Sequence, residues 1–91
     1  MDKLPNGNIL DTKSLGIIVR QQRKSQGATQ VVFASLCGVG VRFISDLENG
    51  KATIEIGKTL QVLKSLGLEL VIQPRGWTQS SFSIEASGRP S

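Results

Sequence analysis

The sequence predicts a small all-α domain followed by one C-terminal β-strand, which we expect to pair with the same strand of a second copy. Four segments between residues 14 and 67 carry apolar side chains at helical spacing, and a glycine closes each of them. Residues 68–73 largely alternate apolar and polar side chains, which is typical of a strand, and Pro74 ends the pattern. A chain of 91 residues has room for one such domain.

Three of the four expected helices start at a residue whose hydroxyl can cap a helix N-terminus. Ser14, Thr29 and Thr53 precede the first, second and fourth patterns, and their oxygens can accept N–H groups of the first helical turn. The third helix is expected over residues 41–49. The side chains expected to be buried are Leu15, Ile18, Val19 and Gln22; Phe33, Ala34 and Cys37; Ile44, Leu47 and Glu48; and Ile56, Leu60 and Leu63.

Around these helices the chain divides into four parts. Residues 1–12 hold Pro, Gly and two Asn without a helical period and are expected to form a flexible arm, whereas residues 13–67 form the helical domain. Residues 68–74 are the expected strand. Residues 75–91 contain Ser and Gly with isolated apolar residues, and we expect a disordered tail.

A single strand in a helical domain leaves its backbone N–H and C=O groups without partners, which is unfavourable. Pairing with the same strand of a second copy is the simplest solution, and it predicts a homodimer. The residues expected at this contact are Leu68, Leu70, Val71 and Ile72.

The composition argues against several classes of function. The chain has no histidine and one cysteine, so we expect no zinc or iron–sulfur site, no disulfide within the chain and no cofactor. It has no nucleophile–base pair, which argues against an enzyme. No apolar run approaches the roughly 18 residues of a membrane-spanning helix, so we expect a soluble, cytoplasmic protein without a membrane partner.

The formal net charge of +4 is concentrated in residues 13–51, which hold six basic and two acidic residues. A compact basic segment is what a polyanionic partner requires. An ordinary solvated surface can carry the same charge, so charge alone leaves both interpretations open.

The second and third helices form a pattern typical of a helix-turn-helix, because only Gly38, Val39 and Gly40 separate them. In such motifs the second helix of the pair lies in the major groove of DNA, with its N-terminal residues at the base edges. An arginine there can hydrogen-bond guanine, and a valine methyl can contact thymine. The residues expected to read bases are Val41, Arg42, Ser45 and Asp46. The alternative for Arg42 is an ordinary solvated residue at a helix start.

Both ends of this helix pair offer groups for phosphate. The N-terminus of the second helix presents unpaired N–H groups and a positive dipole, and the far end of the third helix presents an amide side chain and a lysine. The residues expected to contact phosphate are Thr29, Gln30, Asn49, Gly50 and Lys51.

Three motifs resemble those of a known family. R-x3-G-x-T-Q begins at Arg23, A-x3-G-V at Ala34 and I-S-x-L-E-x-G-K at Ile44. Together with the helix before them, they make residues 14–67 similar to the Xre/Cro family of helix-turn-helix repressors. The resemblance implies a lambda-repressor-like domain of four to five helices, with base-reading and phosphate-contacting residues at the positions given above. It also implies a largely buried ion pair between Arg23 and Glu48.

Within that family, the stretch 41–74 resembles the HipB-like antitoxins, in which a strand follows the helical domain. This resemblance implies a homodimer joined by a two-stranded intermolecular sheet and a palindromic operator in double-stranded DNA upstream of its own gene. It also implies a HipA-like kinase toxin that the antitoxin holds inactive. The candidate residues for toxin contact are Val31, Val32, Leu36 and Trp77.

Other interpretations remain open at this level. The chain could be a stand-alone Xre-family regulator without a toxin, of the phage or restriction-modification controller type, or a protein-interaction adaptor. The apolar residues of the second helix could cover the N-terminal arm and not a partner. Val41 and Phe43 are less polar than is usual at a DNA-facing helix end, so Phe43 faces either DNA or protein.

Overall fold

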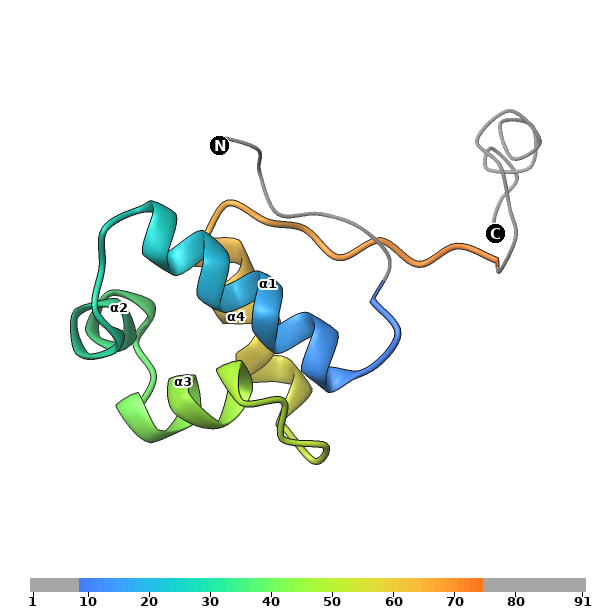
Figure 1. Ribbon diagram of the computed structural model, residues 1–91, viewed down its shortest axis with the longest axis horizontal. Helices are drawn as coiled ribbons and strands as arrows, with labels where there is room; N and C mark the ends of the chain where they lie inside the picture. Colours follow the sequence, from blue (N-terminus) through green and yellow to red (C-terminus); the bar gives the residue numbers. More distant parts are fainter. Residues whose placement is uncertain (1–8, 75–91) are drawn as a thin grey trace.

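The computed structural model describes residues 9–74, and within them the chain forms four helices and no strand. The helices are α1 (Thr12–Ser25), α2 (Gln30–Cys37), α3 (Val41–Glu48) and α4 (Ile56–Ser65). α3 packs against α1 and α2, and α2 also packs against α4. Figure 1 shows the arrangement of the four helices. The predicted all-α fold is confirmed for this part of the chain. The expected arm up to residue 8 and the expected tail, with Trp77, lie outside the described residues.

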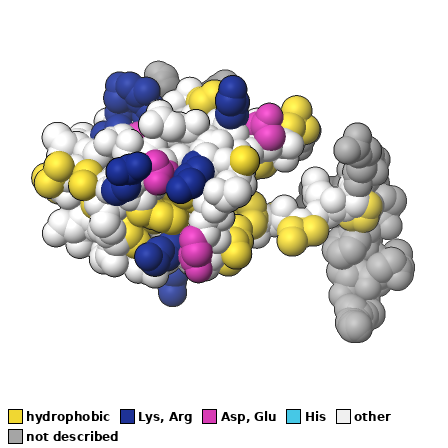
Figure 2. Space-filling view, turned by 90° about the horizontal axis from the view of Figure 1, so that it is seen from below, with side chains coloured by type: hydrophobic (Ala, Val, Ile, Leu, Met, Phe, Trp, Pro, Cys, Tyr) yellow, Lys and Arg dark blue, Asp and Glu magenta, His cyan; other side chains and the backbone are white. Residues whose placement is uncertain are grey.

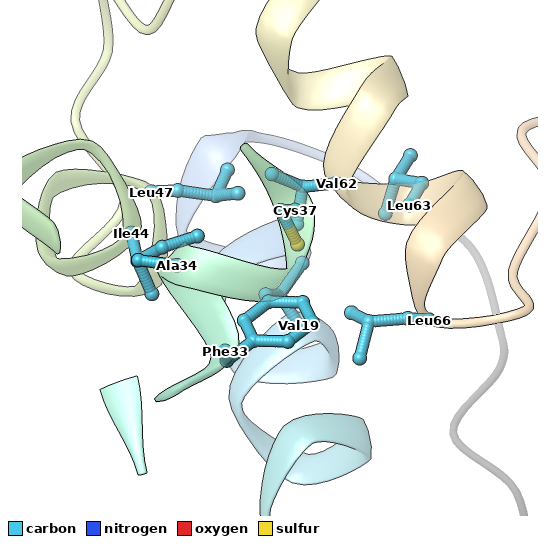
Figure 3. Close-up of a cluster of buried hydrophobic side chains, with 9 residues drawn as sticks. All are labelled: Val19, Phe33, Ala34, Cys37, Ile44, Leu47, Val62, Leu63 and Leu66. Carbon is cyan, nitrogen blue, oxygen red and sulfur yellow. The ribbon is translucent and has the colours of Figure 1, made fainter. Parts of the chain in front are cut away.

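One apolar core joins the four helices (Figure 3). α3 supplies Ile44 and Leu47 to this core, as the sequence predicted, so the opposite side of α3 faces outwards. Burial of a large apolar side chain contributes roughly 1.5–3 kcal/mol to stability. Burial also raises the pKa of the Cys37 thiol, which stays neutral in the core. The core consists of Val19, Phe33, Ala34, Cys37, Ile44, Leu47, Val62, Leu63 and Leu66.

α1 begins earlier than the sequence predicted, because Asp11 and not Ser14 is its N-cap. The Asp11 carboxylate accepts hydrogen bonds from the backbone N–H and from the hydroxyl of Ser14, both at 2.9 Å. These hydrogen bonds lower the pKa of the Asp11 carboxyl. A carboxylate is a stronger acceptor than a hydroxyl, so the cap moves upstream and Thr12, expected in the arm, is the first residue of α1.

α4 has a different cap and a different buried face from those predicted. The Glu55 side chain, and not Thr53, caps the helix by accepting the N–H of Lys58. Of the expected apolar stripe, Ile56 and Leu60 are 59% and 45% exposed. The helix is rotated to bury Thr59, Val62, Leu63 and the adjacent Leu66 instead. Burying Thr59 costs little because its hydroxyl donates to the Glu55 carbonyl at 2.8 Å.

Residues 68–74 follow α4 without helix or strand structure in the single chain (Figure 1). Leu68 packs partly against the core, and its N–H donates to the Leu63 carbonyl at 2.9 Å. Beyond it, Leu70, Val71 and Ile72 are 45%, 66% and 91% exposed. A strand requires a partner for its backbone groups, so pairing with a second copy stays a prediction.

In the part of the chain that the structure describes, no single helix is long and apolar enough to cross a membrane. α2 and α3 reach that length and apolar character only together, as a pair bent by 112°. The apolar side chains that these two helices contribute to the core include Phe33 and Ile44.

Candidate nucleic-acid interface

The turn between α2 and α3 sets the angle at which α3 is presented. Gly38 ends α2 in the left-handed conformation, with φ of +75°, where a side chain would be strained. The Cys37 carbonyl at this end accepts a hydrogen bond from Gln61 Nε2 of α4 at 2.7 Å. The chain direction changes by 112° between the two helices, which falls in the range of about 90–120° typical of a helix-turn-helix.

α3 is held to α1 by a buried ion pair. Arg23 Nε donates to Glu48 Oε2 at 2.6 Å and Arg23 Nη2 donates to Glu48 Oε1 at 2.9 Å, so the contact is bidentate. Arg23 also donates to the Ala28 carbonyl at 2.7 Å, and Gln30 donates to Glu48 Oε1 at 3.0 Å. The hydrogen bond to Glu48 raises the pKa of Arg23. Burial alone would raise the pKa of Glu48, but the hydrogen bonds from Arg23 and Gln30, together with the positive charges of Arg23 and Arg20, more than offset it and leave that pKa below its usual value.

The same helices approach closely at Gly16, a residue that the sequence analysis did not single out. A Cβ atom there would lie 2.5 Å from the Leu47 carbonyl oxygen and 2.6 Å from that of Glu48. One turn earlier, the Thr12 hydroxyl donates to the Gly50 carbonyl at 2.8 Å. A glycine inside a helix costs about 1 kcal/mol relative to alanine, and such a position usually has a packing reason. A glycine inside the expected first helix was therefore the sequence signal that could have indicated this close approach.

The outward face of α3 combines an apolar residue with charged ones. Val41 is 45% exposed, and the Arg42 side chain is 88% exposed. Ser45 and Asp46 are partly buried one turn later. Asp46 Oδ1 lies 3.5 Å from Arg42 Nε, and Asp46 Oδ2 lies 3.6 Å from Lys51 Nζ. Figure 2 shows the molecule from below the view of Figure 1, and on this face Lys and Arg side chains flank an acidic one. The four expected base-reading residues therefore share the outward side of one helix.

Phe43 faces the protein. Its side chain is partly buried against the apolar core, and Lys58 Nζ lies 5.9 Å from the centre of the ring. This distance is within the range of a cation–π contact. Of the two alternatives that the sequence left open for Phe43, the structure selects contact with protein. Gly40, at the N-cap of α3, makes no side-chain capping hydrogen bond.

The expected phosphate-contacting residues lie at the two ends of the helix pair, but several are already engaged within the chain. Thr29 Oγ1 caps α2 by accepting the Val32 N–H at 3.2 Å, and one amide hydrogen of Gln30 is used by Glu48. The Gly50 N–H donates to the Leu47 carbonyl at 3.1 Å, so it is not the open donor that the sequence analysis expected. Asn49 and Lys51 are exposed.

The apolar residues of α2 that the sequence singled out are exposed. Val31, Val32 and Leu36 are 67%, 51% and 75% exposed. α2 itself carries no charged residue. Whether they cover the N-terminal arm is outside the described residues, which begin at residue 9.

α2 and α3 are two eight-residue helices joined at the left-handed Gly38. The buried ion pair holds one side of α3 to α1, and the other side of α3 is exposed. This arrangement defines a helix-turn-helix domain. The chain belongs to the helix-turn-helix family HTH_3, whose family model matches residues 19–73. This is a family of DNA-binding transcriptional regulators and not of enzymes.

A curated relative and several solved structures are similar to this chain. The relative, the uncharacterized HTH-type transcriptional regulator y4mF of Sinorhizobium fredii (strain NBRC 101917 / NGR234), is 50% identical over 62 residues, which are 68% of this chain and 82% of that protein. A HipB–O4 20mer complex matches with a TM-score of 0.70 and 23% identity over 77% of this chain and 99% of that chain. A HipA–HipB–O2–O3 complex matches with the same TM-score, identity and coverage. At this identity the structural similarity establishes a HipB-like fold.

Proposed function

We propose that this protein is a homodimeric transcriptional repressor that binds a palindromic operator through α3 and serves as the antitoxin of a HipBA-like module. The observation that carries the proposal is the outward face of α3. Its side chains are exposed at the entry to the helix, while the buried ion pair between Arg23 and Glu48 fixes the helix from behind. A rigid, exposed helix with an exposed arginine is what base recognition requires.

On DNA, Val41, Arg42 and Ser45 lie at the base edges, and Arg42 hydrogen-bonds a guanine. Thr29, Gln30, Asn49 and Lys51 contact phosphates on either side of the groove. Gly50 forms the turn at the C-terminal end of α3, beside Asn49 and Lys51. The repressor acts in the bacterial cytoplasm on nucleoid DNA, without a cofactor.

The dimer forms through residues 68–74. Leu70, Val71 and Ile72 are exposed in the single chain, and a strand formed with a second copy would give their backbone groups partners. Two-fold symmetry then places two copies of α3 one DNA turn apart, about 34 Å, on a palindromic site.

The antitoxin role is supported by the HipB-like fold, because one HipB structure with this fold is a complex that also contains HipA. The exposed residues Val31, Val32 and Leu36 supply apolar side chains for contact with a HipA-like kinase toxin. A stand-alone regulator is the second candidate, since the relative at 50% identity is named only as an HTH-type transcriptional regulator.

DNA binding is tested by selecting duplexes from a randomised pool with the full chain and measuring affinity by fluorescence anisotropy between 50 and 200 mM salt. We expect a palindromic sequence to be enriched, with affinity falling by about 10³-fold or more over this range if six or more phosphates are neutralised. Affinity that is independent of salt, or enrichment without symmetry, would reject the model.

The antitoxin role is tested separately, by co-purifying the full chain with a kinase-like protein encoded beside its gene. We expect a complex that Leu36→Lys weakens, while Gln21→Lys, at an exposed position on α1, leaves it intact. A chain that binds its operator but no such kinase would be the stand-alone regulator.

A further inference from the structure

We infer that Asp46 is a positioning residue that acts through Arg42 and Lys51, favouring base recognition over non-specific phosphate contact. The inference rests on the proposed DNA-binding function and refines it. The sequence placed Asp46 among the base-reading residues, whereas its contacts in the structure assign it a different task.

Asp46 occupies the space between the two exposed cations beside α3. Its carboxylate is bridging, because Oδ1 lies 3.5 Å from Arg42 Nε and Oδ2 lies 3.6 Å from Lys51 Nζ. The Asp46 side chain is 27% exposed, against 88% for Arg42 and 53% for Lys51, so the acid is recessed behind both cations. The Asp46 carbonyl also accepts the Lys51 N–H at 3.0 Å, which keeps the lysine backbone beside the helix.

The contact with Arg42 uses Nε and leaves both terminal nitrogens free for a bidentate contact with a base. Arginine reads guanine O6 and N7 through a pair of N–H groups. With Nε drawn towards Asp46, the two terminal Nη groups of Arg42 remain available for the base edge. A separation of 3.5 Å is too long for a strong hydrogen bond, so Asp46 biases the direction of the guanidinium without locking it.

The carboxylate also acts on phosphates. Non-specific binding draws surface cations to the DNA backbone, and Asp46 would then lie close to the same phosphates and repel them. When Arg42 instead enters the groove and binds a guanine, the contact with Asp46 can persist. Asp46 therefore weakens binding to random DNA more than binding to the operator.

The test uses Asp46→Asn in the full chain, because asparagine keeps the shape and removes the charge. The probes are the palindromic duplex selected by the wild-type protein and a scrambled duplex of the same composition. We expect affinity for the scrambled duplex to rise about threefold to tenfold, and affinity for the selected duplex to change less than about twofold. Asp46→Glu keeps the charge and should preserve the ratio of the two affinities. Gln21→Lys, at an exposed position on α1, makes the same change of +1 in charge and should leave the ratio unaltered.

The role of Arg42 is separated by repeating Asp46→Asn in an Arg42→Ala background. If Asp46 acts through Arg42, the ratio of the affinity for the selected duplex to the affinity for the scrambled duplex then falls by much less than in the wild-type background. An equal fall in both backgrounds, or an unchanged ratio in the single variant, overturns the proposal. It is also overturned if Asp46→Asn loses affinity only at one C·G pair, because Asp46 would then contact a base itself. Equal affinity of the wild-type protein for both duplexes would instead reject the proposed function.

Discussion

Replacing Arg23 with methionine removes the cation that holds α3 in place and keeps most of the side-chain length. The Arg23 and Glu48 side chains are 8% and 2% exposed, and their contacts are 2.6 and 2.9 Å long. The variant leaves a buried carboxylate with a hydrogen bond from Gln30 but no cation, which costs about 3–5 kcal/mol. In a domain of this size each kcal/mol lowers the melting temperature by about 4–8 °C, so we expect a loss of at least about 12 °C at pH 7.

The pH dependence distinguishes a lost charge pair from lost packing. In the wild-type protein the Glu48 pKa is lowered on folding, so its stabilising contribution is complete above the unfolded pKa of about 4.3 and is lost as the pH falls through the folded value. In the variant, burial without Arg23 raises the Glu48 pKa above the unfolded value. Protonation then favours the folded state, and the stability difference between the two proteins shrinks as the pH falls from 7 to about 4.

Urea unfolding followed by circular dichroism at both pH values measures this difference. Lys24→Met removes an exposed cation from the neighbouring position and should change stability by no more than about 0.5 kcal/mol. Adding Glu48→Met to the Arg23 variant should recover much of the loss, because no buried charge remains. A melting temperature within about 3 °C of wild type, or the same destabilisation at both pH values, would show that the charge pair between Arg23 and Glu48 does not stabilise the fold.

Three further substitutions test the interface, the packing and the dimer. Arg42→Ala should weaken operator binding by about 1–3 kcal/mol and relax specificity at one base pair, as measured with single-position operator variants. An equal loss of affinity for random DNA would make Arg42 a phosphate contact. Gly16→Ala should destabilise the fold by about 1–3 kcal/mol in urea unfolding, because its Cβ meets the Leu47 carbonyl. Gly57→Ala, at an exposed position of α4 where the added Cβ would lie 3.2 Å from the movable Glu55 side chain, should cost less. Equal midpoints for the two alanine variants would contradict the close approach. Leu70→Lys should shift the sedimentation of a wild-type dimer towards monomer, and an unchanged dimer would exclude residues 68–74 from the contact.

Features governed by local chemistry were predictable from the sequence. Thr29 caps α2 as expected because a hydroxyl at that position can satisfy the first-turn N–H groups. Gly38 ends α2 as expected because the left-handed conformation favours glycine. The exposure of Arg42 also followed from the helical period, since Ile44 and Leu47 fix the buried side of α3.

Features that depend on a second element were not predictable in the same way. Two overlapping stripes on α4 have helical spacing, and only packing against α2 and the rest of the core selects the one with Thr59 and Val62. Gly16 matters because α3 crosses α1 there, which the spacing within α1 does not encode. The link from Asp46 to Lys51 was missed because the chain leaves the helix between them, through Gly50.

In the proposed complex α3 faces a polyanion, and its two acids are compatible with that arrangement. Glu48 points inwards and is matched by Arg23, so burial removes one cation and one anion together from the surface of the basic segment. The net charge that residues 13–51 present outside is therefore still +4. Asp46 remains on the surface, but it lies recessed between Arg42 and Lys51. Under the proposed role of Asp46, a neutral residue at this position would raise the affinity for any DNA, whereas the carboxylate favours duplexes in which Arg42 binds a guanine.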